Sequence, residues 1–163
     1  MRLANWTLAV GAALFISGIA FIIAAARETP AAAEAAVPAV EVVPVGDVRQ
    51  IMYAITQPTV DVVYNAVSYV SNAQGVVETE PRTDEEWAHV AANAAALAES
   101  GNLLLTGNRL VDHGDWVKMT RDMIAAAQGA VKAAQARDKM GILDAGAAIN
   151  ETCDNCHAKY QRQ

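Results

Sequence analysis

Hydrophobic residues recur at alternating spacings of three and four along four segments of the chain. This spacing is typical of amphipathic α-helices, because it places the apolar side chains on one helical face. The segments cover approximately residues 47–70, 83–104, 115–131 and 138–160. No segment alternates with period two, and the connections are short. The pattern therefore predicts an all-α fold, an antiparallel four-helix bundle over residues 47–163.

The same pattern predicts helix ends and inward stripes. Thr83 and Glu86 match a capping box before the second helix, and Asp115 is the expected N-cap of the third. Pro58 should kink or interrupt the first helix, because proline lacks the backbone N–H that a helix needs. The expected stripes are, in chain order, Val48, Met52, Ile55, Thr59, Val62 and Ala66; Trp87, Val90, Ala94, Leu97 and Leu104; Trp116, Met119, Met123 and Ala127; and Ile142, Gly146, Ile149, Cys153, Cys156 and Tyr160.

An uncharged apolar run precedes the bundle at residues 3–26. As a helix it would be roughly 36 Å long, enough to cross a bilayer core of about 30 Å. We therefore expect residues 1–26 to hold a single N-terminal transmembrane anchor, with a cleaved signal peptide as the alternative. Residues 27–46 contain three prolines and are expected to form a semi-extended linker. The alternative is that part of this valine-rich segment packs on the domain or on a partner.

Composition narrows the possible functions. The 163 residues are 53% hydrophobic and carry a formal net charge of −6, so the chain is too apolar for a disordered protein. Its acidic balance argues against a nucleic-acid partner, because binding phosphates requires a basic face. Alanine is abundant and prolines are few, which favours long helices. Two cysteines are too few for a disulfide-dense scaffold or a four-cysteine zinc site.

The two cysteines form the motif Cys153-Asp154-Asn155-Cys156-His157. A C-x-x-C-H sequence is typical of covalent attachment of a c-type haem. Thiols three residues apart share one helical face and can both bond to the haem, and the next histidine can bind the iron. We therefore expect one covalent haem c, held by Cys153 and Cys156, with His157 as an iron ligand.

Three other roles for the cysteine pair are weaker. A disulfide within a regular helix has poor geometry. A thioredoxin-like redox pair would lie at a helix N-terminus beside a β-sheet, whereas this pair is near the end of the last predicted helix. A zinc site would need further ligands, and only His89 and His113 remain as additional histidines.

A haem motif on the last helix of a four-helix bundle resembles the class II c-type cytochromes, the cytochrome c′ family. Residues Arg49-Gln50-Ile51-Met52 are similar to an Arg-Gln pair near the start of the first helix in that family. The resemblance implies that Arg49 lies near a haem propionate and that a residue facing the iron follows shortly after it. That residue usually stands four positions after the arginine, which here is Tyr53; Met52 stands three after it.

The sixth position of the iron separates two kinds of chemistry. A methionine ligand raises the reduction potential and suits electron transfer. An apolar residue leaves the iron open to small gases such as NO or CO. Met52 is the expected second iron ligand, because it lies on the inward stripe of the first helix and its soft sulfur suits haem iron. Met119 and Met123 are weaker candidates, and His89 and His113 are expected to be solvated.

These features predict a membrane-anchored, single-haem electron carrier, rather than an enzyme, in the periplasm at a bacterial inner membrane. Its expected partners are redox proteins, mainly membrane-bound electron-transfer complexes. A gas-binding cytochrome c′-like protein and a haem-bearing subunit of a larger respiratory or photosynthetic complex are the alternatives, and a homodimer is possible. The acidic residues Glu78, Glu80, Asp84, Glu85 and Glu86 are expected to form a solvated face that could steer a basic redox partner.

Overall fold

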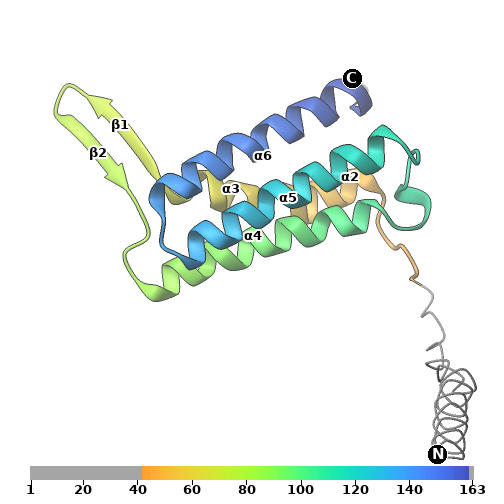
Figure 1. Cartoon of the computed structure of the whole chain (residues 1–163), viewed down its shortest axis with the longest axis horizontal. Helices are drawn as coiled ribbons and strands as arrows, with labels where there is room; N and C mark the ends of the chain where they lie inside the picture. The colour runs from red at the N-terminus through yellow and green to blue at the C-terminus, as the bar shows by residue number, and fades with distance from the viewer. Residues whose placement is uncertain (1–41, 162–163) are drawn as a thin grey trace, which may run out of the picture. The chain divides into compact units, whose positions relative to one another are not determined.

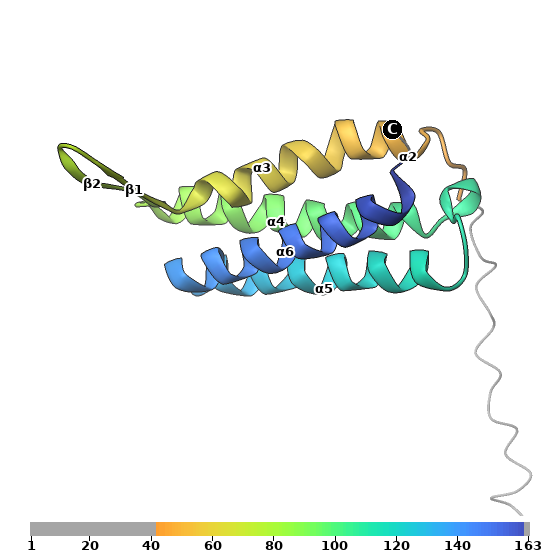
Figure 2. The same ribbon diagram turned by 90° about the horizontal axis from the view of Figure 1, so that it is seen from above.

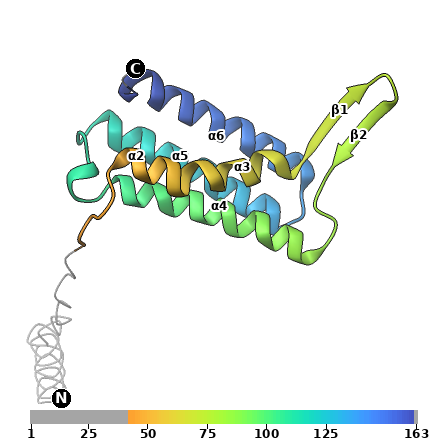
Figure 3. The same ribbon diagram turned by 180° about the vertical axis from the view of Figure 1, so that it is seen from behind.

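A computed structural model of the chain describes residues 42–161. This part of the chain is predominantly helical (Figure 1). Its elements are α2 (Val48–Ile51), the π-helical turn η1 (Met52–Thr56), α3 (Gln57–Ala66), β1 (Ser68–Asn72), β2 (Gly75–Thr79), α4 (Asp84–Leu104), the short 3₁₀ turn η2 (Gly107–Arg109), α5 (Asp115–Gln135) and α6 (Lys139–Tyr160). The segment α2–η1–α3 runs as one continuous rod beside α4, and α5 packs between α4 and α6 (Figure 3). The predicted all-α bundle is therefore confirmed, with one small sheet added.

The three later helices match their predicted bounds closely, and the N-cap residues of α4 and α6 carry capping side chains. Thr83 accepts a hydrogen bond from the Glu86 backbone N–H, and the Glu86 side chain accepts one from the Thr83 backbone N–H, so the predicted capping box is present. Asp138 caps α6 by accepting from the Gly141 backbone N–H at 3.0 Å. All five predicted inward residues of α4 are buried.

The N-cap predicted for α5 is wrong. Asp115 lies in the first turn of the helix, and Gly114 occupies the N-cap position without a side-chain bond. The cap is supplied from farther back, because Asp112 Oδ1 accepts from the Gly114 and Trp116 backbone N–H groups at 2.8 and 3.1 Å. A side chain outside the helix thus accepts hydrogen bonds from backbone N–H groups at the start of α5 that the N-cap residue leaves without a side-chain partner.

The first predicted helix also ends earlier than expected. It stops at Ala66, and residues 68–79 form an antiparallel hairpin in which Val70 pairs with Val77 and Asn72 with Gly75. The hairpin extends beyond the helices at one end of the bundle, opposite the end where the C-terminus lies (Figure 2). All of its side chains except the partly buried Ser68 are exposed. Because no face of the hairpin packs on a core, its sequence carries no period-two alternation.

A second departure lies inside the first helical segment. The Gln57 backbone N–H donates to the Met52 carbonyl, five residues earlier, which makes a π-helical turn just before Pro58. A π-turn holds one residue more than an α-turn and shifts the inward face after it. Val60 and Val63 are therefore buried, whereas Val62 of the predicted stripe is only partly buried. The interruption of the first helix that was predicted at Pro58 is thus a π-helical turn just before the proline.

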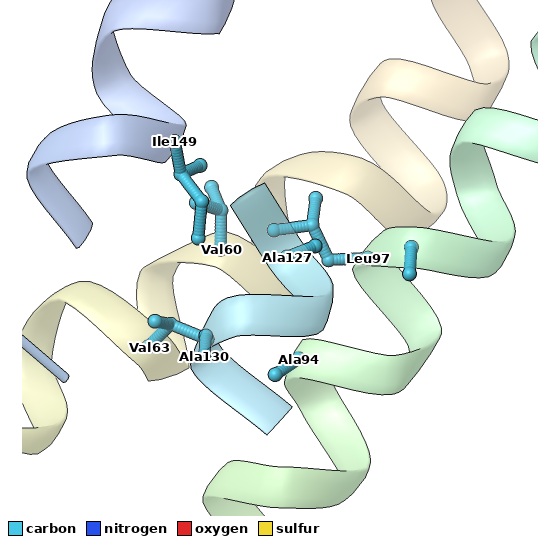
Figure 4. Close-up of a cluster of buried hydrophobic side chains, with 8 residues drawn as sticks. Val60, Val63, Ala94, Leu97, Ala127, Ala130 and Ile149 are labelled. Atoms are coloured by element: carbon cyan, nitrogen blue, oxygen red, sulfur yellow. The ribbon is translucent and has the colours of Figure 1, made fainter. Parts of the chain in front are cut away.

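Small side chains dominate the centre of the core. Ala94, Ala127 and Ala130 are fully buried between α4 and α5, where they pack with Leu97, Val60, Val63 and Ile149 (Figure 4). The absence of bulk at these positions lets the helices approach closely. A further cluster of Ile51, Leu104, Trp116 and Met123 fills the end of the bundle away from the hairpin.

The last residues of the predicted linker pack on the domain. Gly46 accepts a hydrogen bond from Arg109 Nε at 2.9 Å, and a side chain at Gly107 would collide with the Pro44 ring. This agrees with the alternative that part of the linker packs on the bundle. The predicted anchor and the rest of the linker, residues 1–41, lie outside the described residues. Within residues 42–161, none of the helices combines the length and the apolar character that crossing a bilayer requires.

Candidate haem-attachment site

Helix α6 carries the cysteine motif on its last turns. Cys153 and Cys156 are three residues apart, both are partly buried, and both thiols are free. Residues at this spacing lie on the same helical face. Cys153 packs against the central core, and Cys156 packs against the cluster of Ile51, Leu104, Trp116 and Met123. His157 follows with an exposed side chain.

The end of α6 is fixed against the start of α5. The Tyr160 hydroxyl donates to Asp112 Oδ2, and the Tyr160 ring packs edge-on against Trp116 with 5.1 Å between ring centroids. Trp116 Nε1 in turn donates to the Leu104 carbonyl at 3.0 Å. Lys159 forms an ion pair with Asp115 at 2.5 Å. These contacts hold the motif in place from the α5 side, which leaves its other side to face the first helical segment.

A cavity of about 700 Å³ lies between the motif and the first helical segment. Its lining residues are Val48, Arg49, Met52, Tyr53, Gln57, Trp116, Cys156, His157, Tyr160 and Gln161. A second cavity, of about 280 Å³, reaches Cys153 and Tyr64, and both cavities are lined by Met52, Gln57, Cys156 and His157. Their common walls make the two cavities parts of one cleft between α6 and the first helical segment.

Burial governs the chemistry of the two thiols. Desolvation raises the pKa of Cys153 above its ordinary value, and the nearby Asp154 carboxylate raises it further. Desolvation also raises the pKa of Cys156. Reactive redox cysteines have lowered pKa values at helix N-termini, so these half-buried thiols near a helix C-terminus do not fit a thioredoxin-like pair. Burial likewise raises the pKa of Tyr64, which is close to Cys153, to about 12.

The donor set of the cleft fits a c-type haem. Two thiols one helical turn apart and the adjacent imidazole lie on one wall, and the Met52 thioether lies on the opposite wall. A cavity of about 700 Å³ is of cofactor size, because ligand sites span roughly 300–1,000 Å³. Within residues 42–161, no three His, Cys, Asp or Glu side chains come together as a protein-only metal site would require.

The structure brings together all five residues that the sequence singled out. Cys153, Cys156, His157, Met52 and Arg49 line the cleft, with Arg49 exposed at its rim.

The other candidates are placed differently. Tyr53, the position that the family resemblance favours, also lines the larger cavity but is 77% exposed. Met119 and Met123 line only the smaller cavity. His113 is exposed in the turn before α5, and His89 lies on α4 beside a separate pocket near the base of the hairpin.

One residue of the cleft was not predicted from the sequence, since Gln57 lines both cavities. Tyr64, an expected core or pocket-wall residue, lines the smaller cavity and packs against Gly146 of α6. The Asp112–Tyr160 bond joins positions 48 residues apart, which no local pattern could indicate. The only sequence feature that relates Gln57 to the site is its position five residues after Met52. This spacing joins the two residues by a backbone hydrogen bond only in a π-helical turn.

The acidic cluster is partly neutralised by the fold. Lys139 forms ion pairs with Glu78 and Glu80 at 2.8 and 2.7 Å, and Arg137 pairs with Asp84 at 2.7 Å. Glu86 is engaged in the α4 capping box. The cluster is thus tied to the turn between α5 and α6 at the hairpin end of the bundle, away from the cleft.

Comparison with protein-family models, with curated proteins and with solved structures finds no match to this chain. The resemblance to class II c-type cytochromes therefore rests on the motif and its position in the bundle.

Proposed function

We propose that this protein is a membrane-anchored, single-haem c-type cytochrome that transfers single electrons on the periplasmic side of a bacterial inner membrane. One observation supports this most directly. The C-x-x-C-H residues on the last turns of α6 line a cofactor-sized cleft with Met52 on its opposite wall. Each side chain that haem attachment and His/Met ligation require is thus on the same cleft.

The residues of the cleft have distinct roles in this proposal. Cys153 and Cys156 would hold the haem through two thioether bonds, and His157 and Met52 would be its iron ligands. The bound haem would supply a one-electron iron couple. A Met52 ligand would favour the reduced state and so a higher potential. Arg49 at the rim would compensate the negative charge of a propionate.

The walls of the cleft are suited to holding such a group away from water. Leu104 and Trp116 are at most 3% exposed, and they belong to the buried cluster against which both Met52 and Cys156 pack. A low-dielectric surrounding and restricted solvent access are among the features that tune haem potentials. Rigid packing also keeps the ligands in one arrangement, which suits rapid electron exchange.

The location follows from the N-terminal sequence. Residues 3–26 would anchor the chain, and the linker would keep the haem domain close to membrane-bound redox partners. Covalent haem attachment through C-x-x-C-H agrees with an exported domain.

The proposal is tested by producing the 163-residue chain in a bacterial host that matures c-type cytochromes. We expect a coloured protein whose intact mass includes one haem, and a ferric spectrum with the charge-transfer band of a methionine-bound haem. Met52→Ala should abolish this band and leave the haem attached. Met140→Ala is the control, because Met140 is 59% exposed and lies outside the cleft. A colourless product without the added mass would refute the proposal.

Gas binding is the second candidate function. The smaller cavity behind Met52 is lined largely by apolar side chains, among them Val60, Leu104, Met119 and Met123. Such a recess has room for a diatomic ligand. Tight CO binding by the reduced protein, together with a ferric spectrum unchanged by Met52→Ala, would favour this function over electron transfer.

A further inference from the structure

The π-helical turn η1 lies at the cleft, where it carries Met52 and Tyr53. In a regular α-helix both Met52 and Tyr53 would be turned inward, because they precede the buried Thr56 by four and by three residues. In the structure Tyr53 is instead 77% exposed, and Ile51, five residues before Thr56, is buried. The turn thus rotates the helix before it by about one residue relative to the helix after it.

Pro58 is one reason why the turn is not α-helical. Its ring has no N–H to donate and would collide with the carbonyl four residues back, that of Ala54, if the helix were regular. The hydrogen bond from the Gln57 backbone N–H to the Met52 carbonyl widens the turn immediately before the proline. The proline is then accommodated in the first turn of α3.

Buried hydroxyl groups hold the same turn from within. Thr56 Oγ1 donates to Ser100 Oγ of α4 at 3.0 Å, and Ser100 Oγ donates to the Leu97 carbonyl at 2.7 Å. Thr59 Oγ1 lies 2.7 Å from the Ile55 carbonyl oxygen and 3.0 Å from that of Thr56, and its proton is shared between them. Thr56 and Ser100 are at most 5% exposed, so a change in the turn would leave buried polar groups without partners.

We propose that the π-helical turn selects Met52, and not Tyr53, as the side chain that faces the cysteine motif, and that Pro58, Thr56 and Ser100 are the positioning residues that maintain this choice. The inference rests on the proposed haem site. It assigns the occupancy of the sixth iron position to the helix geometry rather than to Met52 alone. Relaxing the turn towards an α-helix would bring Tyr53 to the position that Met52 now holds and turn Met52 towards that of the buried Ile51, which withdraws the thioether from the cleft in a fraction of the molecules.

The test uses the haem-loaded 163-residue chain with Pro58→Ala, Thr56→Val and the double variant. We expect the methionine charge-transfer band to weaken and the apparent CO affinity of the reduced protein to rise at least about tenfold, because that affinity follows the population with an open sixth position. Thr56→Ser keeps the hydroxyl group, so this variant should have the charge-transfer band and the CO affinity of the wild type. Pro81→Ala removes a proline outside the cleft and should change neither readout.

A second readout does not depend on the iron. Tyr53 should react more slowly with a nitrating reagent once it turns inward, whereas Tyr69 on the hairpin, 48% exposed, serves as the internal standard. Peptide masses identify the modified tyrosine, and far-UV circular dichroism shows that each variant is folded.

The outcomes separate the two proposals. Variants that keep the wild-type band, CO affinity and Tyr53 reactivity while Met52→Ala loses the band would overturn the positioning role and leave the cytochrome intact. A haem-containing wild type whose spectrum is unchanged by Met52→Ala would overturn this inference and the methionine ligation together. A protein without haem would refute the cytochrome, and the inference with it.

Discussion

Gly101 shows how closely α4 and α5 approach each other. It is buried, and an added side-chain carbon would lie 2.5 Å from Ile124 Cγ1 and 3.1 Å from Met123 Cε. Gly101→Ala should therefore lower the free energy of unfolding by about 1–3 kcal/mol, because the neighbouring helix must shift to make room. Urea unfolding followed by far-UV circular dichroism measures the change.

Gly129→Ala is the matched control on α5. The nearest atom to its added carbon is Ala145 Cβ at 4.0 Å, an ordinary contact distance. Here the substitution should raise the free energy of unfolding by about 0.5–1 kcal/mol, because alanine loses less backbone entropy in a helix than glycine does. Equal effects at the two positions would contradict the close approach at Gly101.

The thiols of the haem-free chain offer a test by pH. Burial raises the pKa of Cys153 and of Cys156 above the ordinary value of 9.0, so the reactive thiolates form only at higher pH than in an unfolded peptide. Alkylation by iodoacetamide should be slow at neutral pH and reach half its maximal rate above pH 9. Mass spectrometry at a series of pH values follows both cysteines.

Tyr64 provides the comparison for this titration. Its hydrogen bond to Cys153 lowers the pKa of that thiol, in opposition to the burial. Tyr64→Phe should therefore move the alkylation midpoint of Cys153 to still higher pH and leave that of Cys156 in place. A half-maximal rate well below pH 9 in the folded chain would show that the thiols are not desolvated as the structure places them.

At the scale of single elements, the amphipathic helices could be predicted from the sequence, whereas the hairpin and the π-helical turn could not. The capping box of Thr83 and Glu86 marks the start of α4 in the sequence and is present. Helix α6 begins close to its predicted start, where the structure has Asp138 as the N-cap. The stripe of α4 is entirely buried, because packing on two neighbours demands one consistent face. For α5 the start was predicted correctly but the N-cap was not, because Asp112 acts from a position that no simple capping rule uses.

The hairpin and the π-helical turn have no comparable sequence signal. Hairpin residues such as Val76 and Val77 are 69% and 53% exposed, so no buried face imposes an alternation that could reveal the strands. The π-turn depends on Pro58 together with a tertiary bond between Thr56 and Ser100, 44 residues apart. In the cleft, the motif and Met52 could be predicted, whereas the burial of Ile51, which is not on the predicted stripe, could not.

The hairpin should be dispensable for the stability of the bundle. Replacing residues 70–77 by a short glycine-serine turn should change the free energy of unfolding by less than about 1 kcal/mol, because all eight side chains are exposed. Leu97→Ala, at a position with 0% exposure, is the contrasting variant and should cost about 2–5 kcal/mol. Urea unfolding measures both. A loss from the hairpin deletion as large as that from Leu97→Ala would mean that the hairpin supports the core.

At the scale of the whole molecule, the cleft and the linker share one end of the bundle. Pro44 packs over Gly107, and Gly46 accepts from the buried Arg109, so the chain is fixed to the domain just before Arg49 at the cleft rim. Only residues 27–43 then remain to connect the domain to the predicted anchor. As a polyproline-like segment they would reach about 53 Å. In the proposed cytochrome, electron exchange would thus be restricted to partners at or near the membrane surface.

Membrane attachment is the last prediction, and it concerns the chain as a whole. The 163-residue protein should sediment with membranes and resist alkaline carbonate, because residues 3–26 would be a hydrocarbon-spanning helix. A variant whose first 26 residues are replaced by a cleavable export signal should appear in the soluble periplasmic fraction with its haem spectrum unchanged. The intact mass of the wild type decides between the two fates of the N-terminus: an anchor retains residues 1–26, whereas cleavage after Ala26 leaves a shorter, soluble chain and would remove the anchor from the proposed function.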